Sequence, residues 1–422
     1  MRLLAAVLLA LPLAAQQPLH LTLADAEKLA LAHNPAISSA QYSASASHEV
    51  PNEVKSALAP QLSGAITGVG ADGGSRIAAG ALNNPSLYNR IGSGITVTQL
   101  LTDFGRTRDL TTTAGLHAQA QDQVVEGTRA DVLMSTVQAY FAVLRANAVL
   151  KVAQQTVSQR QVMSDKVETL FQNNLKSGLD ASFAKVNLSS AQLLLSQANN
   201  DVNSAEAALA TAIGQPAQTD FDLAEETTPQ TLPATVTPLI QQALQERPEL
   251  KNLRLEQGAA EQFAQAEHAL NYPTIGAVGV VGVAPAGDPQ IPNHYGAAGV
   301  NLSIPILNGG LFHARQNEAE LRAKAAADRV TNEINLVTQD VRTAYLNAAT
   351  ARERVGLTDQ LLTQAQSALD LAQSRYDLGL SSIVELSDAQ LNLTQAQIAN
   401  ASARYEYQAA RLAVDYQTGA LR

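Results

Sequence analysis

Residues 34–60 read NPAISSAQYSASASHEVPNEVKSALAP, and residues 247–273 read RPELKNLRLEQGAAEQFAQAEHALNYP. Both stretches carry proline at their second and last positions, so the two proline pairs are related by one constant shift of 213 residues. Each pair encloses a sequence of helical character. Each second proline opens a segment rich in glycine, valine and isoleucine, which is typical of a strand.

Two further pairs of motifs extend the repeat. Ala139-Tyr140 recurs as Ala344-Tyr345, and Asp103-Phe104-Gly105 recurs as Asn308-Gly309-Gly310, both at a shift of 205 residues. A repeat of this length predicts a duplicated domain, because solenoid units have only about 20–50 residues. The doubled unit is predicted to run helix, strand, strand and very long helical hairpin.

The hairpins are predicted from the distribution of proline and glycine. Residues 106–175 contain no proline and few glycines, and an unbroken helix of that length would extend roughly 100 Å. Lys176-Ser177-Gly178-Leu179 is predicted to reverse the chain, and Asp377-Leu378-Gly379-Leu380 to do so in the second repeat. Near the start of the chain, Thr22 is the predicted N-cap of a helix that Pro35 and Pro51 should bend or interrupt.

These patterns predict a mostly helical protein with a small β part. The predicted parts are a signal peptide at 1–15, a first repeat at 16–214, a linker loop at 215–238 and a second repeat at 239–422. The strand pairs are predicted at about 60–101 and 273–307, and the long helical hairpins at about 106–214 and 311–419.

Composition excludes several classes of protein. The net charge of −10 and the lack of a basic stripe argue against a nucleic-acid partner. The chain has no cysteine, which excludes disulfides and thiolate chemistry, and only 4% of its residues are aromatic. Abundant alanine, glutamine and leucine favour long helices packed through small residues.

The N-terminus indicates export. Met1-Arg2 is followed by an apolar run from Leu3 to Leu13 and by small residues at Ala14-Ala15, the pattern of a secretory signal peptide. The run is shorter than the roughly 20 apolar residues that a spanning helix needs. We therefore expect an exported protein that no helix anchors in a membrane.

The strands indicate how the protein would enter a membrane. Ile91, Ile95 and Val97 alternate with glycine and threonine, so one face of the strand is apolar and the other polar or small. Four strands cannot close a barrel, and open edges are not viable in lipid. Three chains would supply twelve strands, within the range of outer-membrane barrels, with the apolar face toward lipid and the polar or glycine face toward a lumen.

Three tyrosines lie at or near the predicted strand ends, where an aromatic girdle would be placed, although ordinary packing would also explain any one of them. They are Tyr88, Tyr272 and Tyr295.

Several longer motifs stand out along the chain. They are Leu21-Thr-Leu-Ala-Asp-Ala26 leading into Asn34-Pro35, Thr98-Gln-Leu-Leu-Thr-Asp-Phe-Gly105, Ser303-Ile-Pro-Ile-Leu-Asn-Gly-Gly310, and Arg375-Tyr-Asp-Leu-Gly379 followed by Glu385-Leu-Ser-Asp-Ala-Gln390. Together with the order of elements, these motifs resemble those of the TolC family of outer-membrane efflux and secretion ducts. The resemblance covers nearly the whole chain after the signal peptide, and both repeats carry it. The sequence departs from the family at Leu100, where proline is usual, and it ends at Arg422 without the family's C-terminal extension.

The resemblance implies a homotrimer with a twelve-stranded β-barrel in the lipid of the cell outer membrane and a twelve-helix tunnel in the periplasm. The tunnel would be closed at its tip until an inner-membrane transporter and a periplasmic adaptor (membrane fusion protein) dock. The duct would serve a tripartite efflux or type I secretion system and would need no cofactor. Drugs, metal ions and polypeptides would all fit such a tunnel, so the cargo stays open.

The resemblance also implies functional positions. The adaptor-contact turns would include Gly178, Leu179, Gly379 and Leu380, and the periplasmic constriction would include Glu385, Asp388 and Tyr376. Ser381 and Ala184 occupy the positions of the family's latch arginine and aspartate, so the closed state should be held by other contacts. Glu385 and Asp388 are three residues apart on one predicted helix face, and three copies would place six carboxylates around the mouth. Like charges at that spacing raise one another's pKa and attract cations.

No enzyme is predicted. Gly68-Val-Gly-Ala-Asp-Gly73 matches a dinucleotide-binding pattern but precedes a loop instead of a helix, and Asp103-Phe104-Gly105 has no kinase motif around it and is predicted to be a turn. The seven histidines show no metal-ligand spacing. We therefore expect no catalytic, cofactor or metal site.

Two other functions remain open from the sequence. One is a periplasmic coiled-coil scaffold or adaptor without a membrane barrel, although an adaptor normally has one hairpin and here both hairpin and strand pair are doubled. The other is a substrate-specific porin, although porins lack helical hairpins of this length.

Overall fold

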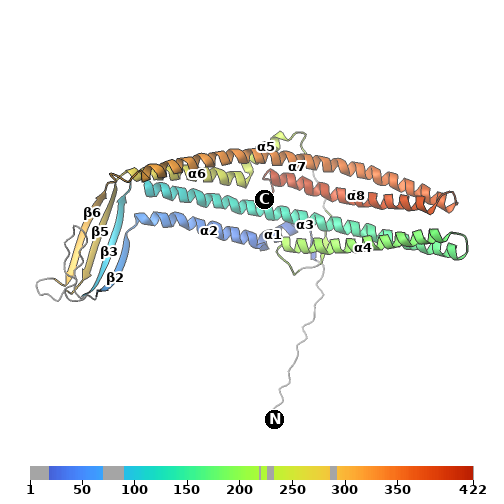
Figure 1. The fold of residues 1–422 in the computed structure, drawn as a ribbon, viewed down its shortest axis with the longest axis horizontal. Helices are drawn as coiled ribbons and strands as arrows, with labels where there is room; N and C mark the ends of the chain where they lie inside the picture. Colours follow the sequence, from blue (N-terminus) through green and yellow to red (C-terminus); the bar gives the residue numbers. More distant parts are fainter. Residues whose placement is uncertain (1–18, 70–89, 218–219, 226–231, 286–291, 422) are drawn as a thin grey trace, which may run out of the picture. The chain divides into compact units, whose positions relative to one another are not determined.

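The structure is a computed structural model that describes residues 19–69, 90–217, 220–225, 232–285 and 292–421 (Figure 1). The predicted signal peptide and Tyr88 lie outside these ranges. The helices are α1 Leu23–His33, α2 Pro35–Lys55, α3 Arg106–Gln172, α4 Gly178–Ala212, α5 Thr237–Glu246, α6 Pro248–His268, α7 Leu311–Asp377 and α8 Ile383–Gln417. The strands are β1 Leu19–Leu21, β2 Gln61–Val69, β3 Arg90–Thr102, β4 Phe221–Leu223, β5 Thr274–Val283 and β6 His294–Ser303.

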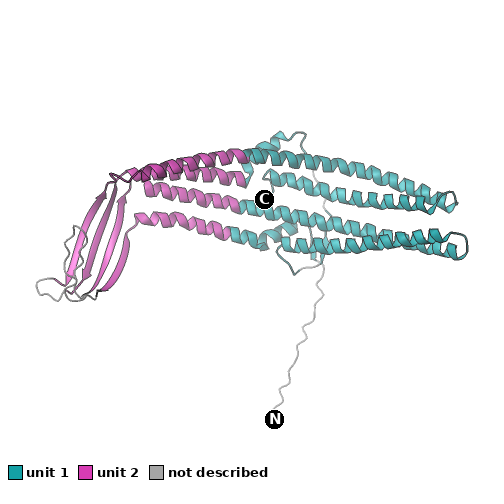
Figure 2. Cartoon of the chain, viewed as in Figure 1, with its two compact units in different colours: residues 1–40, 125–248, 334–422 teal, residues 41–124, 249–333 magenta. Residues whose placement is uncertain are grey.

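The chain forms two compact units (Figure 2). Unit 1 comprises Met1–Ala40, Val125–Pro248 and Ile334–Arg422, and unit 2 comprises Gln41–Val124 and Glu249–Glu333. Each unit thus combines segments from both halves of the sequence, and the long helices α3 and α7 contribute to both units.

Local sequence sets the starts of the helices. Thr22 caps α1 through a capping box with Asp25, which confirms the predicted N-cap. The chain breaks at Asn34, whose side chain accepts a hydrogen bond from the backbone N–H of Ala36, and Pro35 begins α2. Pro51, which was expected to bend or interrupt the helix, does not interrupt it, because α2 continues through it to Lys55. Proline removes only one backbone donor there.

The junction between β3 and α3 is a tight turn, as predicted for Asp103-Phe104-Gly105. The Asp103 carboxylate accepts a 2.7 Å hydrogen bond from the backbone N–H of Thr107 and so caps α3. Phe104 and Gly105 have positive φ angles of 54° and 102°. The repeated positions Gly309 and Gly310 have φ angles of 63° and 83°, so the two junctions share one backbone path.

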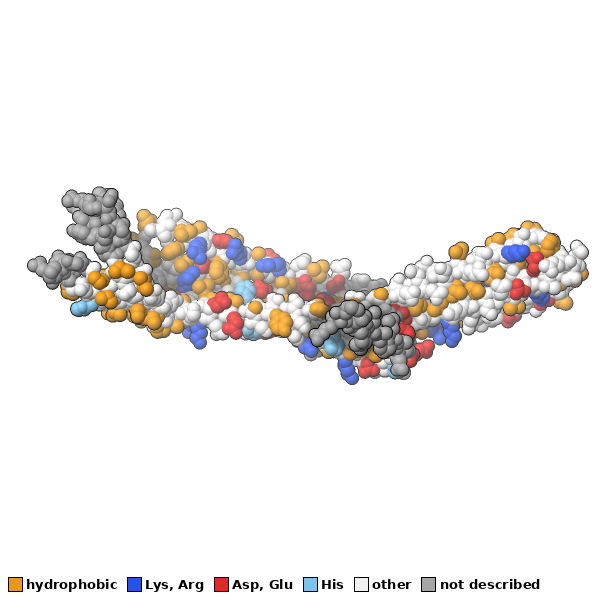
Figure 3. Space-filling view, turned by 90° about the horizontal axis from the view of Figure 1, so that it is seen from below, with side chains coloured by type: hydrophobic (Ala, Val, Ile, Leu, Met, Phe, Trp, Pro, Cys, Tyr) orange, Lys and Arg blue, Asp and Glu red, His pale blue; other side chains and the backbone are white. Residues whose placement is uncertain are grey.

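Unit 2 contains an antiparallel sheet of four strands in the order β2-β3-β5-β6. The register places most of the large apolar side chains of the four strands on one face. These are Leu62, Ile66, Ile91, Ile95, Val97, Ile275, Val281, Val283, Val300 and Leu302, whereas Leu100, Val278 and Val280 lie on the other face. All of the first group except the half-buried Ile275 are exposed, up to 81% for Ile66, and hydrophobic side chains gather over the strands in Figure 3. The opposite face carries mainly glycine, serine, threonine and alanine, which confirms the predicted alternation.

Strands β2 and β6 form the two edges of this sheet, because each pairs with a neighbour on one side only. Within the described ranges, the backbone N–H and C=O groups on their other sides have no strand partner. An exposed sheet edge of 9 or 10 residues is a site for strand addition.

Unit 1 is organised around a core under the two-stranded parallel sheet β1-β4. The fully buried Tyr140 donates hydrogen bonds to the carbonyl oxygens of Leu21, at 3.2 Å, and Ala224, at 2.7 Å. Its repeat counterpart, Tyr345, donates to Pro233 O at 3.0 Å. The two repeated tyrosines therefore hold the two ends of the segment between the halves.

The return helices of the two hairpins are α4 and α8. Each ends beside the break that precedes a proline-initiated helix, before Pro35 for α4 and before Pro248 for α8. Gly214 follows α4 with a φ of +72°, and a Cβ there would lie 2.6 Å from the carbonyl oxygen of His33. Gly419 follows α8 with the same φ, and a Cβ there would lie 3.0 Å from the carbonyl carbon of Glu246. Glycine is required at both positions by the left-handed conformation and by the close approach of the backbone.

One window of α3 is apolar enough to cross a membrane by composition, contrary to the expectation from the sequence. However, 61% of that window is buried within the chain. Its apolar character fits a helix packed inside a protein.

Candidate functional site: the ends of the helical hairpins

The candidate site consists of the turns that close the two hairpins and the helix ends beside them, all within unit 1. Both turns follow the Schellman pattern, in which a residue with positive φ ends the helix. Asn174 has a φ of 57° after α3, and Gly379 has a φ of 74° after α7. Leu175 N–H donates to Leu170 O, and Leu380 N–H donates to Arg375 O, both at 2.8 Å.

The turn of the first hairpin lies earlier in the chain than the sequence suggested. Ser177 is the N-cap of α4 and forms a capping box with Asp180, so Gly178 and Leu179 belong to the first turn of α4. Gly379 and Leu380 do lie in the turn itself. The residue equivalent to Gly379 is therefore Asn174, which tolerates the left-handed conformation that usually selects glycine.

Large apolar side chains are exposed at both turns. They are Leu175, Leu179, Leu378 and Leu380, with 66–75% of each residue accessible. An exposed apolar group of this kind is typical of a protein-binding surface.

Behind the turns, the two hairpins pack together through small residues and one tyrosine. The buried cluster comprises Val167, Ala181, Ala184, Ala372, Tyr376, Ile383 and Leu386. These residues come from α3, α4, α7 and α8, so all four helix ends share one core.

Polar contacts also join the two hairpins. Lys166 Nζ of α3 lies 2.9 Å from Asp377 Oδ1 of α7, and the Asn187 side chain of α4 donates to Ser387 Oγ of α8 at 2.7 Å. The hydrogen bond from Lys166, with one from Gln373, lowers the pKa of Asp377. The ammonium of Lys176 lies 4.0 Å from the centre of the Tyr376 ring, within the range of a cation–π interaction.

The retained tyrosine does not make a latch hydrogen bond. Tyr376 is 3% exposed and its hydroxyl has no hydrogen-bond partner among the described residues. Burial, with the charges of Asp180 and Asp377, raises its pKa. Ser381 Oγ is likewise buried without a partner, and Ala184 lies in the apolar cluster. Within the described chain, the ion pair and the cation–π contact link the hairpins where the family's latch residues are replaced.

The two predicted constriction carboxylates differ in their surroundings. Both are exposed on the first turns of α8. The Glu385 carboxylate forms an ion pair with Arg375, with Oε1 3.1 Å from Nε. The backbone N–H of Glu385 donates a hydrogen bond to Ser382 Oγ. Asp388 has no ion pair within the described chain. The sequence identified both carboxylates but missed Arg375, although the arginine stands ten residues before Glu385.

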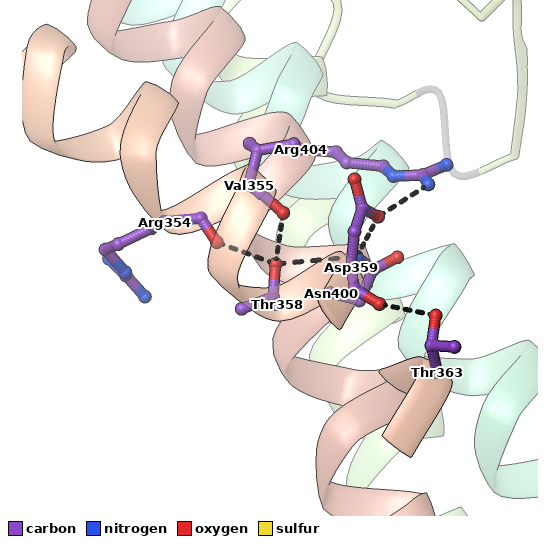
Figure 4. A network of polar contacts seen from close by, with 7 residues as sticks. All are labelled: Arg354, Val355, Thr358, Asp359, Thr363, Asn400 and Arg404. Atoms are coloured by element: carbon purple, nitrogen blue, oxygen red, sulfur yellow. Dashed lines mark hydrogen bonds and ion pairs between the residues drawn. The ribbon is translucent and has the colours of Figure 1, made fainter. Parts of the chain in front are cut away.

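Further from the turns, a polar network joins α7 to α8 (Figure 4). The amide of Asn400, which is 6% exposed, donates to Asp359 Oδ1 at 2.6 Å, and Arg404 Nη2 lies 3.1 Å from the same oxygen. These hydrogen bonds lower the pKa of Asp359. The network fixes the register of the two antiparallel helices.

No group of three or more histidine and acidic side chains able to hold a metal ion is found in the described part of the chain.

Comparison with known proteins gives a consistent result. The model of the family described as "Outer membrane efflux protein" matches residues 27–215 and 239–420. The outer membrane protein TolC of Salmonella enteritidis is 27% identical over 423 residues, an alignment covering 95% of this chain and 83% of that protein. The E. coli TolC is 26% identical, with 92% of this chain and 80% of that protein covered.

Solved structures show the same fold. The crystal structure of CusC superimposes with a TM-score of 0.82 at 19% identity, covering 94% of this chain and 92% of that one. The outer membrane protein VceC of Vibrio cholerae gives a TM-score of 0.79 at 20% identity, covering 94% and 96%.

Proposed function

Because the chain belongs to the outer membrane efflux protein family, we propose how its parts form a duct. The chain is an outer-membrane efflux channel of a tripartite system and is not an enzyme. Three copies join edge to edge, β6 of one copy pairing with β2 of the next. The single observation that carries this assignment is the open, four-stranded sheet with one exposed apolar face. Backbone groups at its edges cannot stay unpaired in lipid, and three such sheets give a twelve-stranded barrel.

Lipid covers the face that carries Leu62, Ile95 and Val281, and the glycine, serine and threonine face lines the lumen. The register supports this orientation, because most of the large apolar side chains lie on one face and the other face carries mainly glycine, serine, threonine and alanine. The division of the mature chain into two repeats at 16–214 and 239–422, after a signal peptide at 1–15, belongs to the same proposal.

The hairpin ends form the periplasmic tip, and the exposed leucines there bind a periplasmic adaptor that also engages an inner-membrane transporter. Leu179 and Leu380 lie in this group, as do Leu378 of the predicted second turn and Leu175, which the sequence did not single out. Gly379 lies in the turn of the second hairpin, and Gly178 begins helix α4 beside the turn of the first. The same tip would serve efflux of small molecules or type I secretion of polypeptides.

At the closed tip, Asp388 contributes more than Glu385 to cation selectivity. Arg375 already compensates the charge of Glu385, whereas Asp388 has no ion pair in the described chain. Three copies of Asp388 would form an unpaired acidic ring that attracts cations and binds multivalent ones.

The test is single-channel recording of the detergent-extracted protein in planar bilayers, with its mass measured in parallel. A trimer that forms cation-selective channels is expected. Asp388→Asn should reduce cation selectivity and block by a trivalent cation more than Glu385→Gln does. A water-soluble monomer without channel activity would contradict the barrel, and equal effects of the two variants would contradict the role given to Arg375.

A further inference from the structure

Tyr295 is the only tyrosine, phenylalanine or tryptophan in strands β2, β3, β5 and β6. The sequence placed it with residues of an aromatic girdle, which would face lipid. The register places it instead on the glycine, serine and threonine face. It belongs to a row of directly paired residues that runs across the sheet from Ala65 through Gly94 and Gly282 to Tyr295.

The ring lies flat along this row. A Cβ on Gly282 would lie 2.4 Å from the ring carbon Cζ of Tyr295, and a Cβ on Gly94 would lie 2.3 Å from its hydroxyl oxygen. Any side chain at either position would collide with the ring. The two glycines therefore form a seat for the tyrosine, and the aromatic side chain covers backbone that the glycines leave bare.

Among the described residues, the other side of the ring is accessible. Tyr295 is 44% exposed although it covers two strands, and the residues paired along its row, Ala65, Gly94 and Gly282, are small. An aromatic face in this arrangement can stack on planar groups and attract cations through its quadrupole. The position is near the strand ends away from the helices, because α7 follows β6 at the other end.

We propose that Tyr295 is a lumen-facing aromatic platform that contacts planar aromatic or cationic solutes as they pass through the barrel. This inference rests on the proposed function, since only a closed barrel turns the small-residue face into a lumen. It assigns a solute-contacting residue to the barrel, distinct from the acidic ring at the tip.

The absence of tryptophan from the chain allows a test of location. The single-tryptophan variants Tyr295→Trp and Ile95→Trp are compared after reconstitution into phosphatidylcholine vesicles with and without brominated acyl chains. Trp at 295 should be quenched by acrylamide and not by brominated lipid, and Trp at 95, on the opposite face, should show the reverse. Quenching of both by brominated lipid would overturn the inference and leave the barrel standing. Quenching of neither would contradict the barrel as well.

Contact with solute is tested with methyl viologen, a planar aromatic dication that quenches tryptophan at contact. Quenching of Trp at 295 should saturate, as for a bound complex, whereas Tyr42→Trp on exposed helix α2 should show linear, collisional quenching. Adding Gly94→Ala to Tyr295→Trp fills the seat and should weaken binding about two- to fivefold, the range expected for one exposed cation–π contact. Linear quenching at both positions would overturn the inference, even if the location test succeeds.

The larger indole could disturb the seat, so Tyr295→Phe and Tyr295→Ala provide a second measurement. Methyl viologen added at the side of the bilayer facing the strand ends is expected to block the current of Tyr295→Phe like the unsubstituted protein. The same block should be about two- to fivefold weaker in Tyr295→Ala. Equal block in the two variants would contradict the platform.

Discussion

At the scale of single residues, charges are placed where helices must be held together. Glu267, at the end of α6, is 1% exposed and lies between two arginines. Arg106 Nη2 of α3 is 3.2 Å from Oε1, and Arg315 Nε of α7 is 2.6 Å from Oε2. Three helices of unit 2 therefore meet at one carboxylate, and a buried carboxylate is tolerated only with such partners.

Glu267→Gln is expected to lower the free energy of unfolding by about 2 kcal/mol, because it removes charge-assisted hydrogen bonds and leaves two arginines without their counterion. Thermal unfolding in detergent measures the loss. The control is Glu53→Gln in exposed α2, where no ion pair is found in the described chain and a change below about 0.5 kcal/mol is expected. Equal effects of the two variants would show that the ion pairs of Glu267 with Arg106 and Arg315 do not stabilise the fold.

Asp377→Asn is expected to loosen the tip by removing the ion pair with Lys166. An exposed pair contributes at most about 1 kcal/mol, so the open population should rise by no more than roughly fivefold per copy. Single-channel conductance at neutral pH gives the readout. Asp370→Asn on the same helix serves as the control. Within the described chain, the Asp370 carboxylate accepts a hydrogen bond only from Gln366 of its own helix, so this variant should leave conductance unchanged.

The same contact predicts a narrow pH dependence. The pKa of Asp377 is held below its ordinary value of 3.8, chiefly by the hydrogen bond from Lys166. A lowered pKa means that the contribution to stability is present above the unfolded pKa and lost as the pH falls through the folded one. Protonation of Asp377 should therefore leave the conductance of the tip unchanged from pH 8 to pH 5. The conductance should rise only below about pH 4. That rise should be absent in Asp377→Asn.

At the scale of elements, the fold depends on how each return helix ends. Gly214→Ala should destabilise the protein by at least about 1–2 kcal/mol from the left-handed backbone alone, with a further cost from the approach to His33. Gly356→Ala is a control for which a change in stability of the opposite sign is expected. Gly356 lies inside α7 with open space around it, so alanine should stabilise the helix by about 0.5–1 kcal/mol. Urea unfolding of the two variants separates the effects.

The elements that were predictable from the sequence are those specified by local signals. The Thr22 cap, the break at Pro35 and the alternating strands need only neighbouring residues, and the structure confirms them. Pro51 does not interrupt α2, because a single proline removes one hydrogen bond without ending the helix. The first hairpin turn was misplaced because Asn174 adopts the conformation that the sequence suggested for glycine.

The side-chain contacts at the candidate site were not predictable from the sequence. Lys166 and Asp377 are 211 residues apart in the chain, and no local pattern relates them. Glu385 was found, but its compensation by Arg375 depends on the path of the turn between α7 and α8. The orientation of Tyr295 follows from the pairing register of β5 and β6, which period-two alternation alone does not fix for a residue at a strand end.

At the scale of the whole molecule, a single chain exposes several surfaces that are unfavourable to leave uncovered. The sheet has two unpaired edges and one apolar face, and the hairpin ends carry exposed leucines. In the proposed duct, another copy would cover the edges, lipid the apolar face and a second protein the tip.

The hydrogen bonds of Tyr140 and Tyr345 have a consequence for how such a channel can be encoded. Tyr140 holds Ala224 and Tyr345 holds Pro233, while Gly214 and Gly419 each dock within their own half of the sequence. A chain cut between Glu225 and Leu232 would keep all four contacts, so two co-expressed polypeptides should copurify as a working channel, detectable by bilayer recording. A duct of three copies would then consist of six half-length polypeptides.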